Sequence, residues 1–201
     1  MKKLSVAVLA FLLFCSHVVL AQSSPDCDGS IVFDSNRTGV SEIYVVNSDG
    51  SGERQLTFAS VRVDFSRVPD LSPDGKRVVF NGNRQGQGPG IYVINCATRE
   101  DWLLIAGAEA HSPRWSPDAA HIAFRKSDAI FIVDADGTNL REIEGLPDFS
   151  SAPSWSPDGN QIAFVSRGAV TWEIFTIELG SGRVQQLTRT TDARISSQGP
   201  A

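Results

Sequence analysis

The side chains that could carry chemistry in this 201-residue sequence are scattered serines, many carboxylates and a few histidines. A nucleophilic serine of the elbow type requires Gly-x-Ser-x-Gly at a strand-to-helix turn, and this pentapeptide does not occur. The Gly-Ser-Gly pieces at Gly50–Gly52 and Gly180–Gly182 are typical of hairpin turns instead. The sequence therefore predicts no catalytic serine.

Metal and acid–base chemistry find no stronger support in the sequence. His111 and His121 follow the N-terminal apolar stretch, and neither belongs to a cluster with metal-ligand spacing. The run Asp134–Gly137 is like a calcium loop only superficially, because its glycine comes too early for an EF-hand. The other carboxylates lie mostly in expected turns, so no acid–base pair stands out. We predict no metal and no cofactor.

A repeat organises most of the chain. Ser-Pro-Asp triplets begin at Ser72, Ser116 and Ser156, at intervals of 44 and 40 residues. Each is followed by two apolar runs and a more polar one. The first runs are Val78–Phe80, Ile122–Phe124 and Ile162–Phe164, and the second are Ile91–Ile94, Ile130–Val133 and Ile174–Ile177. The N-terminal stretch fits the same template without an opening strand, with runs at Ile31–Phe33, Ile43–Val46 and Arg54–Thr57.

Each repeat has about the length of one four-stranded propeller blade. Its middle runs are almost continuously apolar, as expected for strands covered on both faces by neighbouring blades. Ser-Pro-Asp-Gly suits the tight turn after an opening strand. We therefore predict an all-β fold, a β-propeller of four four-stranded blades. It is either closed by the C-terminal strand or an incomplete piece of a larger propeller.

The template also sets the predicted boundaries. Residues 1–21 are expected to be a signal peptide and residues 22–201 the propeller domain. The repeats cover about 31–58, 67–105, 112–144 and 151–188, and residues 189–201 would open a further or closing blade.

The first residues have the features of an export signal. Lys2 and Lys3 precede an apolar stretch that ends at Leu20, and Ala21 completes a small-residue cleavage site. A membrane anchor is the alternative, but no basic stop-transfer cluster follows. We expect a periplasmic or secreted protein with no membrane span after cleavage.

Cleavage would leave an acidic chain with two cysteines. Removing two lysines changes the formal net charge from −5 to −7. A charge of this sign argues against nucleic acid as a partner, because phosphate contacts need a surplus of Lys and Arg.

In an oxidising compartment Cys27 and Cys96 either pair or remain separate thiols.

Several motifs resemble a known family. Pro113–Asp118 and Pro153–Gly159 each lead into an Ile-Ala-Phe strand. With Glu42–Val45 and Arg54–Thr57 they resemble the repeats of the TolB-type β-propeller family, over roughly residues 31–201. The resemblance implies a non-enzymatic, periplasmic or secreted propeller that contacts other proteins, among them an envelope lipoprotein. The family also carries an α/β domain before a propeller with more blades, and neither is found here.

Similar repeats occur in prolyl-oligopeptidase-like peptidases and in some oligogalacturonate lyases. One alternative function is therefore a lyase or hydrolase that acts on an acidic saccharide, with His111 or an aspartate as the base. The other is the propeller remnant of a peptidase.

Charge placement suggests where a partner binds. The loops between second and third strands share one end of a propeller with the links between blades, and this end carries a surplus of arginines. Arginine suits bidentate contact with carboxylates, so we expect an acidic protein segment to bind there. The residues expected at the channel mouth are Arg62, Arg67, His111, Arg114 and Arg194. Three further arginines at similar places in their repeats are expected to tie blades together: Arg37, Arg84 and Arg167.

Overall fold

The computed structural model describes residues 26–58, 65–169 and 171–190, which form fifteen strands in four antiparallel sheets. The first sheet contains β1 (Ser30–Ser35), β2 (Glu42–Asn47) and β3 (Arg54–Gln55). The second contains β4 (Phe65–Leu71), β5 (Arg77–Arg84), β6 (Gly88–Asn95) and β7 (Asp101–Ala106). The third contains β8 (Ala110–Trp115), β9 (His121–Lys126), β10 (Ala129–Asp134) and β11 (Arg141–Glu142). The fourth contains β12 (Ser151–Trp155), β13 (Gln161–Arg167), β14 (Trp172–Glu178) and β15 (Arg183–Gln186).

These sheets are the predicted blades, so the all-β propeller fold is confirmed. Three of them have four strands, and the first has three because it lacks an opening strand, as the repeat template indicates. The predicted signal peptide lies outside the described residues, and so do residues 191–201 of the predicted closing strand. In the described part of the chain there is no helical segment with the length and hydropathy that a bilayer crossing requires.

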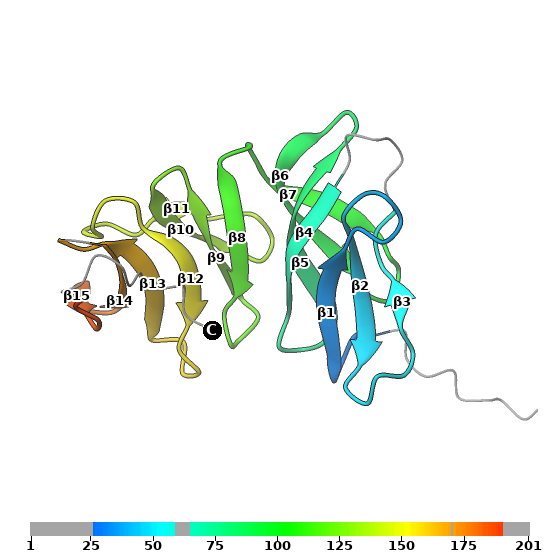
Figure 1. Cartoon of the computed structure of the whole chain (residues 1–201), viewed down its shortest axis with the longest axis horizontal. Helices are drawn as coiled ribbons and strands as arrows, with labels where there is room; N and C mark the ends of the chain where they lie inside the picture. Colours follow the sequence, from blue (N-terminus) through cyan, green and yellow to red (C-terminus); the bar gives the residue numbers. More distant parts are fainter. Residues whose placement is uncertain (1–25, 59–64, 170, 191–201) are drawn as a thin grey trace, which may run out of the picture.

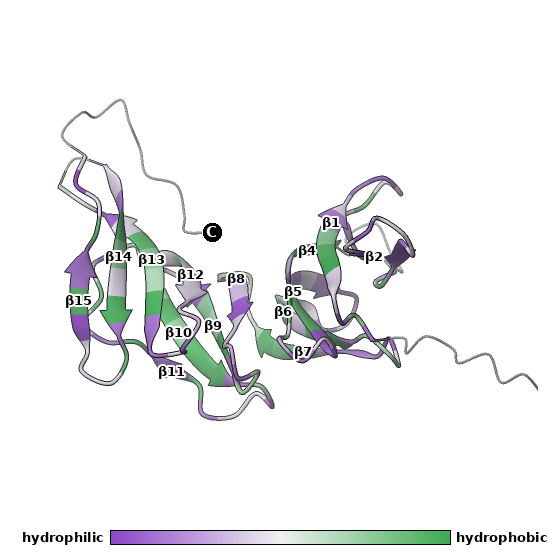
Figure 2. Ribbon diagram, turned by 90° about the horizontal axis from the view of Figure 1, so that it is seen from below, coloured by the Kyte–Doolittle hydropathy of each residue, from purple (hydrophilic) through white to green (hydrophobic). Residues whose placement is uncertain are grey.

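The sheets stand side by side in an arc, with the first and fourth at opposite ends (Figures 1 and 2). Within each sheet, hairpins join the strands in chain order. The opening strands β4, β8 and β12 follow one another along the inner side of the arc, and β8 contacts both of the others. Residues on these three strands therefore face the position of a propeller channel.

An apolar layer fills the space between each pair of neighbouring sheets. The middle strands supply it from both faces: Phe80 packs toward the first sheet, whereas the adjacent Val79 packs toward the third. Figure 2 shows these middle strands as the most hydrophobic parts of the ribbon. Each layer also contains a stacked aromatic pair from facing positions of two strands. The pairs are Phe80–Tyr92, Phe124–Phe131 and Phe164–Phe175, with ring centroids 5.9, 6.0 and 5.7 Å apart.

The Ser-Pro-Asp turns repeat one hydrogen-bond pattern. In the third sheet the Ser116 hydroxyl bonds the Asp118 carboxylate and also accepts the His121 N–H at 2.9 Å. The hydrogen bond from the Ser116 hydroxyl lowers the pKa of Asp118 most, and the bond from the Ala120 N–H lowers it further. Ala119 has a φ of 56° where the other repeats have glycine, a conformation that costs a residue with a side chain about 1 kcal/mol.

A disulfide joins the first sheet to the second. Cys27, just before β1, is bonded to Cys96 at the end of β6, and their Cα atoms are 5.8 Å apart. Both side chains are fully buried in the layer between these sheets. The bond closes a loop across a sequence separation of 69 residues, so it restricts the unfolded chain strongly.

We predict that Cys27→Ala together with Cys96→Ala lowers the free energy of unfolding by roughly 2–5 kcal/mol. Denaturant titration without reductant measures the loss. Reductant should bring the original protein close to the double variant and leave the variant unchanged. An original protein that is insensitive to reductant under unfolding conditions would contradict this prediction.

Close packing of neighbouring strands in the second sheet leaves no room for a side chain at Gly90. Gly90 on β6 lies between β5 and β7, and a Cβ there would clash with the Ile105 carbonyl and sit 2.8 Å from Leu103 Cδ1. The Leu103 side chain can rotate away, but the Ile105 carbonyl cannot move without disturbing the β6–β7 ladder.

We predict that Gly90→Ala lowers the free energy of unfolding by roughly 2–3 kcal/mol because it overpacks this seam. Gly180→Ala is the matched control, since nothing lies within 4 Å of its added Cβ. Denaturant titration of both variants checks the difference, and equal stabilities would show that the seam can relax.

Candidate functional site

The inner strands share a backbone bulge that presents their side chains. Val68, Ser112 and Ala152 have φ values of 53°, 55° and 50°, and each directly precedes a proline. The register of the ladder to the next strand shifts at the same place in all three sheets. A bulge bends a strand and re-aims the side chains beside it. Each inner strand thus has one group of residues before the bulge and another after it.

The preceding blade holds this bulge in two of the three cases. The Val68 N–H donates to Asp34 Oδ1 at 3.2 Å, and the Ser112 N–H donates to Asn81 Oδ1 at 2.9 Å. The Asn81 amide also donates to the Ala110 carbonyl at 2.6 Å. These bonds satisfy backbone groups that the bulge removes from the ladder, and they fix the spacing of the blades.

Two of the predicted partner-binding residues lie before the bulge at equivalent positions. Arg67 on β4 and His111 on β8 are both exposed on neighbouring inner strands. The Arg67 guanidinium carbon lies 5.6 Å from the centre of the Phe65 ring. Arg62 and Arg194 lie outside the described residues, so their predicted positions at the channel mouth remain predictions.

The third described residue of that set lies after the bulge, beside a partly buried carboxylate that sequence reasoning missed. Arg114 is partly buried, and its Nη1 donates to the Pro113 carbonyl at 2.8 Å. Asp70 occupies the equivalent position on β4, and its Oδ2 accepts the Trp115 N–H at 2.7 Å. Burial raises the pKa of Asp70, while the Trp115 N–H and the positive charge of Arg114 act in the opposite direction. Aligning the repeats on Ser-Pro-Asp would have placed Asp70 and Arg114 together.

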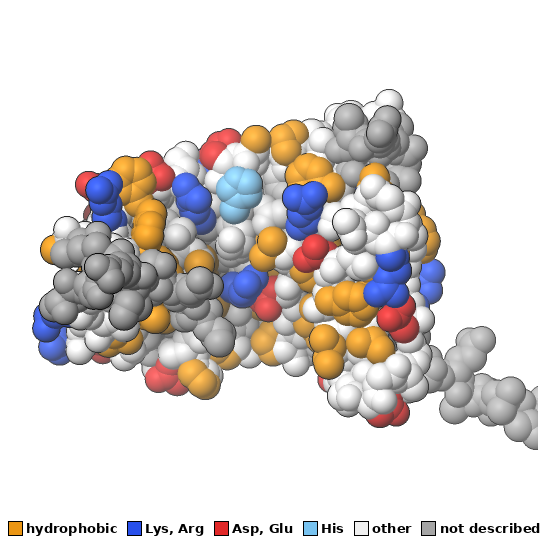
Figure 3. Space-filling model, in the orientation of Figure 1, with side chains coloured by type: hydrophobic (Ala, Val, Ile, Leu, Met, Phe, Trp, Pro, Cys, Tyr) orange, Lys and Arg blue, Asp and Glu red, His pale blue; other side chains and the backbone are white. Residues whose placement is uncertain are grey.

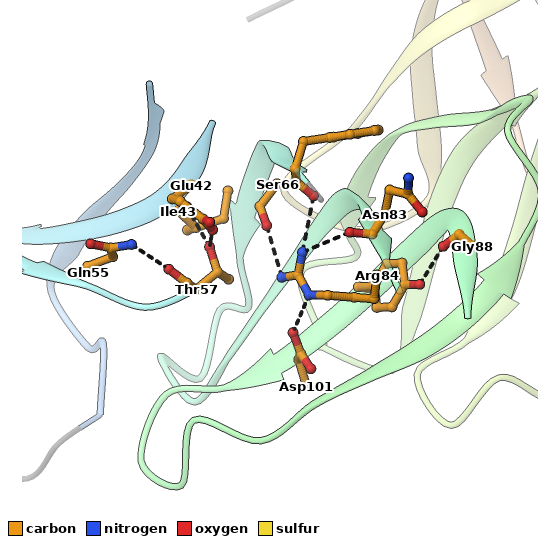
Figure 4. A network of polar contacts seen from close by, with 11 residues as sticks. Glu42, Ile43, Gln55, Thr57, Ser66, Asn83, Arg84, Gly88 and Asp101 are labelled. Atoms are coloured by element: carbon orange, nitrogen blue, oxygen red, sulfur yellow. Dashed lines mark hydrogen bonds and ion pairs between the residues drawn. The ribbon is translucent and has the colours of Figure 1, made fainter. Parts of the chain in front are cut away.

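Arg84 has a structural role, but it joins strands of its own blade and does not tie two blades together as predicted (Figure 4). Its Nε donates to Asp101 Oδ2 at 3.1 Å, and its Nη2 donates to Ser66 Oγ at 2.9 Å. Its guanidinium carbon lies 5.5 Å from the Phe80 ring centre, above the stacked pair. Arg37 repeats the arrangement in the first sheet, where it covers Tyr44 at 4.5 Å and pairs with Glu53.

Arg167 does not repeat this arrangement, contrary to the prediction. Arg84 is four residues beyond the aromatic residue of its strand, whereas Arg167 is three beyond Phe164. Because side chains alternate along a strand, an offset of one residue turns Arg167 to the opposite face of its sheet. It is exposed there and lines a different pocket.

A second motif also proves to be structural. Glu42 is buried and bonded to the Thr57 hydroxyl, which accepts the Ile43 N–H at 2.9 Å (Figure 4). Glu173 and Thr188 repeat this contact in the fourth sheet. The Glu-Ile and Gln-Leu-Thr pieces of the repeat thus join the third and fourth strands of a blade.

At the opposite end of the blades His121 lies between two carboxylates. Its Nδ1 is 3.8 Å from Asp118 Oδ1, and its Nε2 is 3.5 Å from Asp134 Oδ1. It borders a pocket of about 470 Å³ between the third and fourth sheets. Over the described ranges, no three His, Cys, Asp or Glu side chains come together as a metal site would require.

Charge on the molecular face is dispersed. Figure 3 shows Lys and Arg side chains across the width of one face, with acidic and apolar side chains between them. Recognition of an acidic partner would therefore depend on individual arginines in defined surroundings and not on a broad basic field.

Comparison with known proteins agrees with the fold. No protein-family model matches the sequence. A TolB homologue of Chlorobium luteolum is 34% identical over 177 residues, which is 86% of this chain and 40% of that protein. The Tol-Pal system protein TolB of Francisella tularensis is 32% identical over 121 residues, or 57% of this chain and 28% of that protein. The crystal structure of TolB from Acinetobacter baumannii superposes with a TM-score of 0.68 at 23% identity, covering 82% of this chain and 42% of that one.

The chain thus spans less than half the length of these proteins.

The surroundings of Asp70 predict a pH dependence of stability. Because its pKa is raised above the ordinary value of about 3.9, the native state binds more protons than the unfolded state above that pH. The original protein should therefore lose stability relative to Asp70→Asn as the pH rises from about 4. Denaturant titrations of both proteins between pH 4 and 7 (about the range in which a raised carboxyl titrates) measure the difference.

Asp118→Asn is the control with the opposite sign. The pKa of Asp118 is lowered, so its stabilising effect is present above the ordinary pKa and is lost as the pH falls. A pH-independent difference between the original protein and Asp70→Asn would show that burial of this carboxyl has been misjudged.

Proposed function

Because the chain belongs to the TolB-type β-propeller repeat family, we propose that it is an exported, non-catalytic module that binds a protein partner. The observation that carries the proposal is the 34% identity to a TolB homologue over 86% of the chain. A related protein is named as a component of the Tol-Pal system, which favours the bacterial envelope as the place of action. The expected partner is an envelope protein, such as a lipoprotein, with an acidic segment.

The arrangement of the inner strands supports a binding role. Arg67 and His111 are exposed at equivalent positions on neighbouring strands, and Arg114 follows on the second of them. The bulges and their hydrogen bonds to the preceding blade hold the backbone that carries these side chains. A rigid scaffold that presents a few polar side chains and variable loops suits protein recognition.

The proposal is tested by affinity capture of envelope proteins on immobilised residues 22–201, followed by calorimetric titration of the captured protein. Arg67→Ala together with Arg114→Ala should weaken binding at least about tenfold if these residues contact the partner. Arg183→Ala is the control, because Arg183 is exposed at the tight-turn end of the fourth sheet. Thermal unfolding of each variant separates lost binding from lost folding.

Two outcomes would contradict the proposal. One is unchanged affinity of the folded double variant for every captured protein. The other is turnover of oligogalacturonides or of chromogenic peptides by the purified chain, which would favour an enzyme.

A further inference from the structure

One backbone carbonyl recurs at every junction between neighbouring sheets, at the end of the blades that carries the Ser-Pro-Asp turns. It belongs to the fourth residue of the turn, which is Gly75, Ala119 or Gly159. At the first junction the Gly75 carbonyl accepts the Cys27 N–H at 2.8 Å. At the second junction the Ala119 carbonyl accepts a hydrogen bond from Arg77 Nη2 at 3.3 Å. In both cases the preceding blade supplies the donor.

At the second junction Arg77 also covers an aromatic ring. Its guanidinium carbon lies 4.6 Å from the centre of the Trp115 ring, and Trp115 is only 5% exposed. A guanidinium on an indole face is attracted by the negative face of the ring, in addition to the carbonyl that it bonds. The second junction therefore shows which chemical group such a place holds.

The third junction has the same ring and carbonyl without the cation. Trp155 precedes its turn as Trp115 does, and His121 stands where the second sheet has Arg77. The backbone N–H groups of Arg77 and His121 each donate to the serine hydroxyl of their own turn, which fixes this correspondence. Over the described ranges no group donates to the Gly159 carbonyl.

His121 does not take the place of the guanidinium. Its ring nitrogens lie near Asp118 and Asp134 of its own sheet. The space that remains is the pocket of about 470 Å³ between the third and fourth sheets, which Trp155 and Gly159 help to line. Trp155 is accordingly only half-buried, whereas Trp115 is buried. Both sheets that form this pocket are described, so it is not an open end of the arc.

The charges around the pocket favour a cation. Asp118 and Asp158 both line it. Hydrogen bonds, first of all from the serine of each turn, lower the pKa of both carboxyls, so both are ionised at neutral pH. Arg141 is the basic residue of the lining besides His121. Among the described residues it neither pairs with a carboxylate nor covers the Trp155 ring.

We propose that this pocket binds the guanidinium of an arginine side chain from a partner protein, as Arg77 occupies the second junction from within the chain. The guanidinium stacks on the Trp155 ring and donates to the Gly159 carbonyl, and its remaining N–H groups face the two carboxylates. This site goes beyond the proposed function, because it takes a basic side chain and lies at the end of the blades opposite to Arg67 and His111.

The test titrates residues 22–201 with acetyl-Gly-Arg-Gly-amide and follows the indole N–H resonance of Trp155 by two-dimensional NMR. A cation–π contact and a charge-assisted hydrogen bond together should give a Kd of about 1 mM. Two matched peptides carry citrulline, which keeps the shape without the charge, or lysine, which keeps the charge without the planar fork. Both should bind at least about fivefold more weakly.

A substitution that fills the pocket from within provides the second arm. His121→Arg should occupy the pocket as Arg77 does at the second junction, and should weaken peptide binding at least about tenfold. Gln161→Arg is the matched control, because it adds the same charge at the equivalent position of the fourth sheet, and Gln161 does not line this pocket. It should leave binding unchanged.

Three results would overturn the inference. They are no shift of the Trp155 resonance at about 10 mM peptide (about ten times the expected Kd), equal affinity for the citrulline or lysine peptide, and unchanged affinity of the folded His121→Arg variant. Failure here leaves the proposed function standing, because that function is tested with a captured envelope protein and with Arg67 and Arg114.

Discussion

Burial of both faces of each sheet is the constraint on which this structure depends. The middle strands carry large apolar residues on alternate sides, so a sheet standing alone would expose two apolar faces to water. Full burial of a Phe or Ile side chain is worth about 1.5–3 kcal/mol, and each layer between sheets contains several of them. Stacking neighbours is the arrangement that covers both faces, and the arc follows from it.

Hydrogen bonds at the inner edge then make the stacking specific. Apolar layers alone would tolerate sliding of one sheet over the next, because burial has no direction. The carboxylate of Asp34 and the amide of Asn81 accept N–H groups from the bulge of the following blade, so each fixes one register. The inner strands thereby gain a rigid backbone, and the side chains on either side of the bulge can be presented to a partner.

The strand positions, the tight turns and the missing first strand could be predicted because the repeat records them residue by residue. The bulges could not, since positive φ at Val68, Ser112 and Ala152 contradicts the ordinary preference of these residue types. The recurring proline after each of them was the available signal.

Arg167 was misplaced for another reason. Three arginines looked equivalent by their distance from a strand end, but a single residue of offset decides which face of the sheet a strand side chain occupies. Asp70 was missed because its burial depends on the next blade.

The covalent link between the first two sheets also determines how the chain would bear tension. Cys27 lies at the start of the described chain, and its bond passes directly to the end of β6. A pull from the N-terminal side would enter the molecule through the sulfur atoms and reach the second sheet, bypassing the strands of the first. The loop closed by the disulfide contains the first sheet together with β4, β5 and β6, so a pull from that side would be transmitted first to the strands after Cys96.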